Sequence, residues 1–273
     1  WQRARAMFYA AFAMPRHPAA HQIAAYEAAD AGIARRLEDT PPEGERRALL
    51  TVRSEIMNAL GLAVLQARGA ADPVRARAIL SEALSLNMEP WLGDWKGQAI
   101  ALGGLGDCAN ALGDRTEAIQ LWGRNLDMSH TMSDLGGICR MSSQMADVIL
   151  QQQAEETEAN GDQLNYARSL FVDSLDAARK QRNTGGMLCA LAGTLRVESA
   201  QLDSDPDAVK ELADAMQGLH QFVTVDDTRP GPIPGWAAGI AVTAVDAVDA
   251  ANTVPDMLAE LTSTRDALCK LMS

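Results

Sequence analysis

The sequence predicts an all-α fold, and three observations support this. First, 47% of the residues are hydrophobic but only 4% are aromatic, and runs rich in Val, Ile, Thr and Tyr, which are typical of strands, are missing. Second, apolar residues recur at three- and four-residue steps, which places them on one face of a helix. Third, Asp72-Pro73 and Asp205-Pro206 have the chemistry of helix starts, with Asp as the N-cap and Pro in the first turn. A chain of 273 residues is long enough to bury a large core.

Residues 99–129 contain the clearest pair of amphipathic helices. The apolar residues of each helix share one face; they are Leu102, Leu105, Ala109 and Leu112 in the first helix and Ala118, Leu121, Trp122 and Leu126 in the second. Gly113 suits the left-handed conformation that ends many helices. Asp114, with Glu117 three residues later, fits the capping box of the next helix. Because Gly106 has only a hydrogen as its side chain, we expect the two helices to approach each other closely there.

The order of residues in this pair resembles the tetratricopeptide repeat family. The family's Leu-Gly, Ala, Gly-Asp, Ala, aromatic order is matched by Leu105-Gly106, Ala109, Gly113-Asp114, Ala118 and Trp122. Asn125 departs from the pattern, because the family usually has a small residue there. The resemblance implies a solenoid of helical hairpins that serves as a protein-interaction scaffold.

The second-helix pattern recurs along the chain, as repeat architectures require. Its copies are residues 22–31, 76–84, 167–175 and 208–216. The spacing of about 40–50 residues is longer than the family's shortest repeat of about 34 residues. We therefore predict a single solenoid domain over residues 1–273, a right-handed superhelix of about six hairpins and about 12 helices. The expected hairpins are 1–38, 43–88, 91–130, 133–182 and 184–223, with a C-terminal capping pair at 235–272.

The charge of the chain narrows the choice of partners. A net charge of −12 argues against direct binding to nucleic acid and against an anionic membrane surface.

The cysteines and the apolar runs indicate where the protein is found. Cys108, Cys139, Cys189 and Cys269 form no CxxC pair and are expected to be reduced and buried. The longest apolar run, residues 236–245, is too short to span a bilayer. We expect a cytoplasmic protein, and because the chain begins without Met at Trp1, we expect a fragment of a longer one.

The resemblance implies that the first helix of each hairpin lines a concave groove for an extended peptide or a helix. By position, the groove residues are Glu55, Asn58, Gly103, Asp107, Asn110, Gln151, Glu155, Glu158, Thr194 and Glu198. Asn and Gln side chains can bridge a ligand's backbone N–H and C=O groups, while the acids would favour Lys or Arg on the ligand. The expected partner is thus a protein or peptide with basic residues. The alternative is that these are ordinary solvated positions. The resemblance also implies a sensor or adaptor part of a signalling protein.

Two tryptophans precede the central pair. Trp91 and Trp95 are four residues apart and would form either a hot spot for a partner or a contact that joins one repeat to the next.

Catalysis and metal binding have little support in the sequence. His17 and His21 have a metal-compatible spacing, but Pro18 intervenes and no third ligand is evident. We predict no enzyme activity and no cofactor. Residues 228–235 are rich in Pro and Gly and form either a linker or a lid. The alternative function is an all-helical enzyme or small-ligand binder with a site between Asp226 and Trp236.

Overall fold

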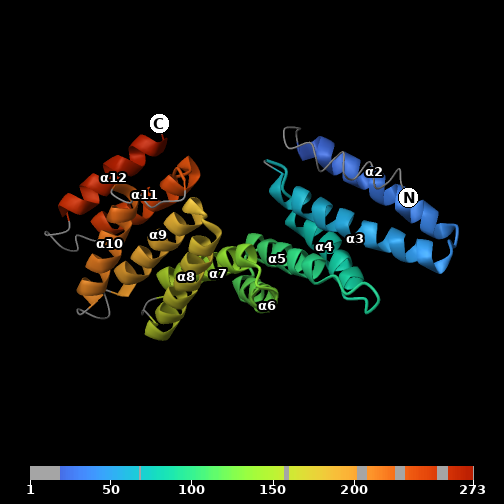
Figure 1. Cartoon of the computed structure of the whole chain (residues 1–273), viewed down its shortest axis with the longest axis horizontal. Helices are drawn as coiled ribbons and strands as arrows, with labels where there is room; N and C mark the ends of the chain where they lie inside the picture. Colours follow the sequence, from blue (N-terminus) through green and yellow to red (C-terminus); the bar gives the residue numbers. More distant parts are fainter. Residues whose placement is uncertain are drawn as a thin grey trace. The chain divides into compact units, whose positions relative to one another are not determined.

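The helices of this chain follow one another in antiparallel pairs (Figure 1). The computed structural model describes residues 19–67, 69–156, 160–201, 208–224, 231–250 and 258–272. Within them every regular element is a helix: α2 (Ala19–Glu38), α3 (Glu43–Gln66), α4 (Pro73–Asn87), α5 (Trp95–Ala111), α6 (Arg115–Met132), α7 (Leu135–Glu155), α8 (Gly161–Gln181), α9 (Thr184–Gln201), α10 (Ala208–Thr224), α11 (Gly235–Ala250) and α12 (Leu258–Met272). The all-α prediction is confirmed. Five of the expected hairpins each contain two consecutive helices, whereas the first helix of the expected hairpin 1–38 lies outside the described residues.

The chain divides into two compact units, Trp1–Met128 and Ser129–Ser273. The boundary falls within α6, so we describe each unit separately. In each of them most successive helices pack side by side, as in an α-solenoid. A single domain over residues 1–273 stays a prediction.

In unit 1, glycines let the helices approach one another closely. α3 packs against α2, α4 and α5, and α4 also packs against α5. Leu80 of α4 is fully buried between Gly61 of α3 and Gly104 of α5. A Cβ at position 104 would lie 2.8 Å from Leu80 Cδ1, which is closer than real Cβ contacts. A larger residue at either glycine would therefore push α4 away.

The predicted helix pair of residues 99–129 packs as expected. Trp122 is 1% exposed, and a Cβ on Gly106 would overlap its indole ring. Gly113 has a φ of +86°, and the backbone N–H of Glu117 donates to Asp114 Oδ1 at 2.9 Å. The Glu117 side chain accepts a hydrogen bond through Oε1 from Arg77 Nη2 at 2.7 Å. The predicted turn and N-cap are thus confirmed.

Asn125, the residue that departs from the family pattern, is buried and has a polar partner. Its Nδ2 donates to the backbone oxygen of Ala99 at 2.7 Å. This hydrogen bond joins α6 to the start of α5. A small residue at position 125 would leave the space of the amide empty.

In unit 2, α9 is the central helix. It packs against α7, α8, α10 and α11, and α12 packs against α10 and α11. Phe171 of α8 is 1% exposed, and a Cβ on Gly193 of α9 would overlap its ring. In the expected capping helix, Leu261 and Leu268 are buried but Leu271 is 41% exposed.

The cysteine prediction needs one correction. All four thiols are free, and Cys108 and Cys139 are buried as expected. Cys189 is only partly buried, and Cys269 is exposed. Cys269 is exposed because its neighbour Leu268 occupies the inward face of α12, and consecutive residues of a helix lie on different faces.

One described helix, α3, is long and apolar enough to cross a membrane by length and composition alone. Half of its apolar window is buried inside the protein, including Leu49, Ile56 and Leu60. This is the character of a core helix. Cytoplasmic localisation stays a prediction.

Candidate functional site

Some of the predicted groove residues of unit 1 make hydrogen bonds inside the protein. Asn58 is 5% exposed, and its Nδ2 donates to the backbone oxygen of Gly97 at 3.1 Å. This burial removes Asn58 from the groove surface. Trp122 Nε1 donates to Asp107 Oδ1 at 3.0 Å and to the backbone oxygen of Gly103 at 3.2 Å. Asp107 therefore orients a core ring. Glu55 is half-buried on α3, and Asn110 is exposed at the end of α5.

The two tryptophans of the predicted hot spot have different surroundings. The guanidinium carbon of Arg47, on α3, lies 5.7 Å from the centroid of the half-buried Trp91 ring. This cation–π distance joins the α4–α5 connection to α3. Trp95, the first residue of α5, is 55% exposed. Trp91 thus makes the joining contact, while Trp95 is the more accessible ring.

In unit 2, one predicted groove residue is clearly interior. Glu198 is 3% exposed and forms an ion pair with Arg168 of α8. Burial raises the pKa of Glu198, and Arg168 opposes that rise. This residue therefore faces α8 and is buried in this structure, and the prediction that it contacts a ligand stays a prediction. Thr194 is half-buried, and its hydroxyl donates to the backbone oxygen of Ala190 at 3.1 Å.

Two further predicted residues of unit 2, Gln151 and Glu155, lie at the end of α7 and are exposed. The third, Glu158, lies outside the described residues.

A cavity of about 320 Å³ lies within unit 2, between α7, α9 and α11. These are the first helices of three successive hairpins. Its lining combines buried Cys139, Phe171 and Gly186 with polar side chains and two large apolar ones. The other lining residues are Gly136, Arg140, Ser143, Gln144, Asp147, Gln181, Asn183, Cys189, Arg196, Trp236 and Ile240.

The charged groups of this cavity come from α7 and α9. Arg196 Nη1 donates to Asp147 Oδ1 at 2.6 Å, and Arg140 lies two turns before Asp147 on α7. Burial raises the pKa of Asp147, while Arg196 lowers it to a lesser extent. The Asp147–Arg196 pair thus connects α7 to α9 at the side of the cavity.

The hydroxyl and thiol groups are held by internal contacts. Ser143 Oγ lies 2.8 Å from Ser174 Oγ, and the Ser174 hydroxyl is 3.0 Å from the backbone oxygen of Cys139. Burial, together with Asp147 and Cys139, raises the pKa of Cys189 to about 12. The Cys189 thiol is therefore protonated at neutral pH and supplies no thiolate nucleophile.

The apolar wall of the cavity belongs to α11. Trp236 is 63% exposed and Ile240, one turn later, is 43% exposed. A Cβ on Gly185 would lie 2.8 Å from Trp236 Cζ2, so the glycine lets the ring approach the first turn of α9. The Thr184 hydroxyl donates to the backbone oxygen of Gly231 at 3.3 Å, which holds the preceding segment against the same turn.

The alternative site near residues 226–236 is only partly visible. Asp226 and residues 225–230 lie outside the described part of the chain, and the linker-or-lid question falls largely on them. Trp236, at the other end of that segment, lines the cavity. Among the residues the structure describes, no group of three or more His, Cys, Asp or Glu could hold a metal ion.

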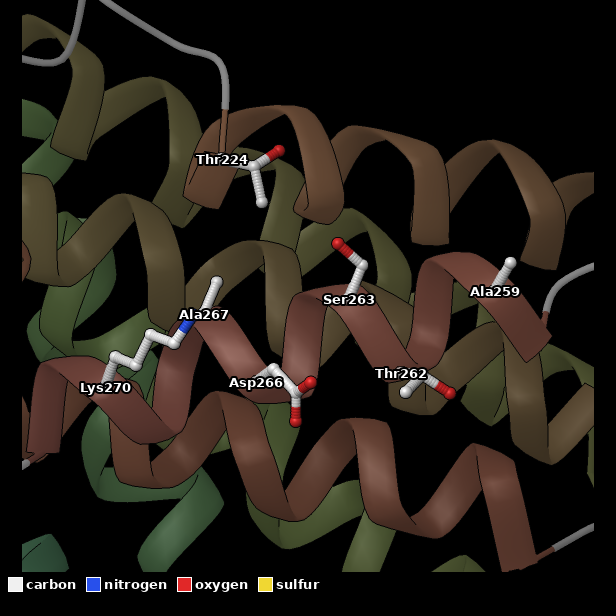
Figure 2. A pocket seen from close by; sticks show the side chains of 7 residues that line it. All are labelled: Thr224, Ala259, Thr262, Ser263, Asp266, Ala267 and Lys270. Atoms are coloured by element: carbon white, nitrogen blue, oxygen red, sulfur yellow. The ribbon is translucent and has the colours of Figure 1, made fainter.

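A second hollow, of about 780 Å³, lies beside α12 (Figure 2). Six of its seven lining side chains come from α12, and Figure 2 shows Thr224 of α10 opposite them. All except Ala267 are exposed, including Asp266 and Lys270. Because no buried floor converges on a ligand position, this hollow is a surface depression and the α7–α9–α11 cavity is the better candidate.

Sequence reasoning missed the charged residues of the cavity, although a signal was present. Arg140, Asp147 and Gln151 follow one side of α7 at helical spacing, so the predicted Gln151 lies one turn beyond the cavity residue Asp147. Arg196 had no such signal, because its role depends on how α9 is rotated about its own axis.

Comparison with known proteins supports the fold. No protein-family model and no curated protein matches this chain. Among solved structures that match is BtubC (BKLC) from P. vanneervenii, at 13% sequence identity and a TM-score of 0.56, covering 93% of each chain. A likeness at this identity shows the all-helical fold alone.

Proposed function

We propose that this chain is a tetratricopeptide-like scaffold that binds a peptide or protein segment through the α7–α9–α11 cavity of unit 2. The observation that supports the proposal is that the first helices of three successive hairpins line one cavity, as the family resemblance implies for a ligand-binding face. The buried floor and the exposed Trp236 give it the anatomy of an interaction hot spot. The proposal extends to a role of this chain as the sensor or adaptor part of a larger signalling protein.

Panning a displayed library of random peptides against the full chain tests the proposal. The selected peptides are then titrated against Ile240→Ser and against Val172→Ser, a matched control. Val172 is 48% exposed on α8 and Ile240 is 43% exposed on α11, but only Ile240 lines the cavity. We expect at least tenfold weaker binding to Ile240→Ser and no change with Val172→Ser. A selection without binders, or binders indifferent to Ile240→Ser, would overturn the proposal.

A small-molecule ligand for the same cavity is the second candidate function. Its volume of about 320 Å³ favours it, since ligand pockets span about 300–1,000 Å³. In that case peptide panning fails, whereas a small-molecule fragment raises the melting temperature.

A further inference from the structure

The charged side chains of the α7–α9–α11 cavity are already engaged within the protein. Three of its described lining residues are charged, namely Arg140, Asp147 and Arg196. Arg196 Nη1 donates to Asp147 Oδ1 at 2.6 Å, and Arg140 has an interaction partner of its own. The Cys189 thiol adds no charge at neutral pH, because burial raises its pKa to about 12. A charged ligand group would therefore lose water in this cavity without gaining an unpaired counter-charge.

Two of the neutral polar groups that line the cavity are engaged as well. Ser143 Oγ lies 2.8 Å from Ser174 Oγ. The Oδ1 atom of Asn183 accepts a hydrogen bond from the backbone N–H of Gly186 at 3.0 Å. Because these groups already have partners, a ligand gains most from the apolar part of the lining.

The apolar part of the lining favours an aromatic group. Trp236 and Ile240 are large, exposed and one helical turn apart on α11, so both still have apolar surface to bury. Phe171 is a second aromatic residue of the lining. Aromatic pairs in offset or edge-to-face contact gain more than the burial of their area alone, and an aliphatic side chain makes no such pair.

The size of the cavity fits one such ring. An apolar cavity of about 150 Å³ is large enough to bind benzene. The cavity of unit 2, at about 320 Å³, thus has room for a phenyl or indole side chain together with the main chain that carries it. It is at the small end of ligand sites, which suits one anchoring side chain of a peptide and not a folded domain.

We propose that the cavity binds its peptide through one uncharged aromatic side chain, which packs against Trp236 and Ile240. This rests on the proposed scaffold function and specifies the residue type by which the ligand is recognised. The Asp147–Arg196 pair contributes to that specificity: because each charge is balanced by the other, the cavity favours neither an acidic nor a basic side chain.

The test is a titration of four fluorescein-labelled peptides with the full chain, read by fluorescence anisotropy. The peptides carry Phe, Leu, Glu or Lys between identical Gly-Ser flanks. We expect the Phe peptide to bind at least about tenfold more tightly than the Glu and Lys peptides and several-fold more tightly than the Leu peptide. Ile240→Ser should weaken the Phe peptide by about tenfold, whereas Val172→Ser, which removes an exposed apolar side chain outside the cavity, should not change its binding.

Asp147→Asn tests the part of the ion pair, because it leaves the charge of Arg196 unbalanced. This variant should bind the Glu peptide several-fold more tightly than the unaltered protein does, which a merely structural role for Asp147 would not produce. Asp176→Asn is the matched control, since Asp176 is exposed on α8, pairs with Arg179 and does not line the cavity. Its peptide preferences should be unchanged, and circular dichroism should show that all the variants retain their helices.

The peptide series separates a failure of this inference from a failure of the scaffold function. If the Leu, Glu or Lys peptide binds as tightly as the Phe peptide or more tightly, the inference is overturned and the scaffold function stands. An unchanged response of Asp147→Asn to the Glu peptide would show that the ion pair does not set the charge preference. If none of the four peptides binds at millimolar concentration, the inference is wrong, and the panning experiment decides whether the scaffold function is wrong as well.

Discussion

In both units an aromatic ring packs on a glycine, but the polar side chains near the two rings make different contacts. In unit 1, the aromatic ring of Trp122 packs on Gly106, and in unit 2 the ring of Phe171 packs on Gly193. Each ring comes from the second helix of a hairpin and each glycine from a first helix. The indole N–H of Trp122 requires an acceptor, which Asp107 supplies. Phe171 has no polar atom, and it lies in the wall of the cavity.

The two units also differ in where their polar side chains lie. On α5 of unit 1, the acid Asp107 is engaged by the core ring, and Asn58 of α3 is buried. On α7 and α9 of unit 2, Asp147 and Arg196 pair with each other at the edge of a cavity. A close glycine–aromatic approach thus occurs in both units. The polar groups differ: in unit 1 Asp107 contacts the ring, and in unit 2 Asp147 and Arg196 pair beside a cavity.

The largest expected effect is loss of either ring. Trp122→Ala and Phe171→Ala should each destabilise the protein by roughly 3–5 kcal/mol, because each removes a fully buried aromatic side chain beside a glycine that cannot fill the space. Urea denaturation followed by circular dichroism measures the change. Trp95→Ala is the control, since that ring is 55% exposed and its loss should change stability by about 0.5 kcal/mol or less. A near-neutral Trp122→Ala would mean that the ring is not packed on Gly106.

The second test compares two neighbours on α5. Asp107→Ala should cost about 1 kcal/mol, because Trp122 Nε1 loses one of its two acceptors and retains the Gly103 oxygen. Asn110→Ala should change stability by about 0.5 kcal/mol or less, since Asn110 is exposed. Thermal unfolding of both variants measures the difference. Equal melting temperatures would show that Asp107 does not hold the ring, and that unit 1 keeps a polar surface comparable to that of unit 2.

Local signals were sufficient to predict the helices but not the cavity. The turn at Gly113, the cap at Asp114 and the buried Trp122 follow from short-range spacing, so they could be read from the sequence. The site depends on the rotation of α9. Contacts of Gly186 with Cys139 and of Gly193 with Phe171 set that rotation, which places Arg196 beside Asp147 and turns Glu198 toward Arg168.

Because these contacts join residues far apart in the chain, periodicity alone could not choose between the two faces of α9. The prediction selected Thr194 and Glu198, and the cavity is lined by Cys189 and Arg196.

The smallest expected effect is an opposite response of the two units to acid. Hydrogen bonds from Arg47 and Arg36 hold the pKa values of Glu43 and Glu45, respectively, below the ordinary value, whereas burial raises the pKa values of Asp147 and Glu198. A carboxyl with a lowered pKa stabilises the folded state above its unfolded pKa, and that contribution is lost as the pH falls through the folded pKa. For a raised pKa the sign reverses: stability falls as the pH rises through the folded value and is regained on acidification.

As the pH falls from neutral through the acid range in which these carboxyls gain protons, amide hydrogen exchange, corrected for its intrinsic pH dependence, should therefore accelerate in α3 relative to α9. Glu198→Gln should remove most of the response of α9, because the amide has no proton to gain and can still accept from Arg168. The exposed pairs of α3 should respond weakly, since solvent screens ion pairs between exposed side chains and they contribute little to stability. A parallel change in both helices would mean that burial does not raise the pKa values of the carboxyl groups in unit 2. The carboxyl groups of the two units would then respond to pH in the same way.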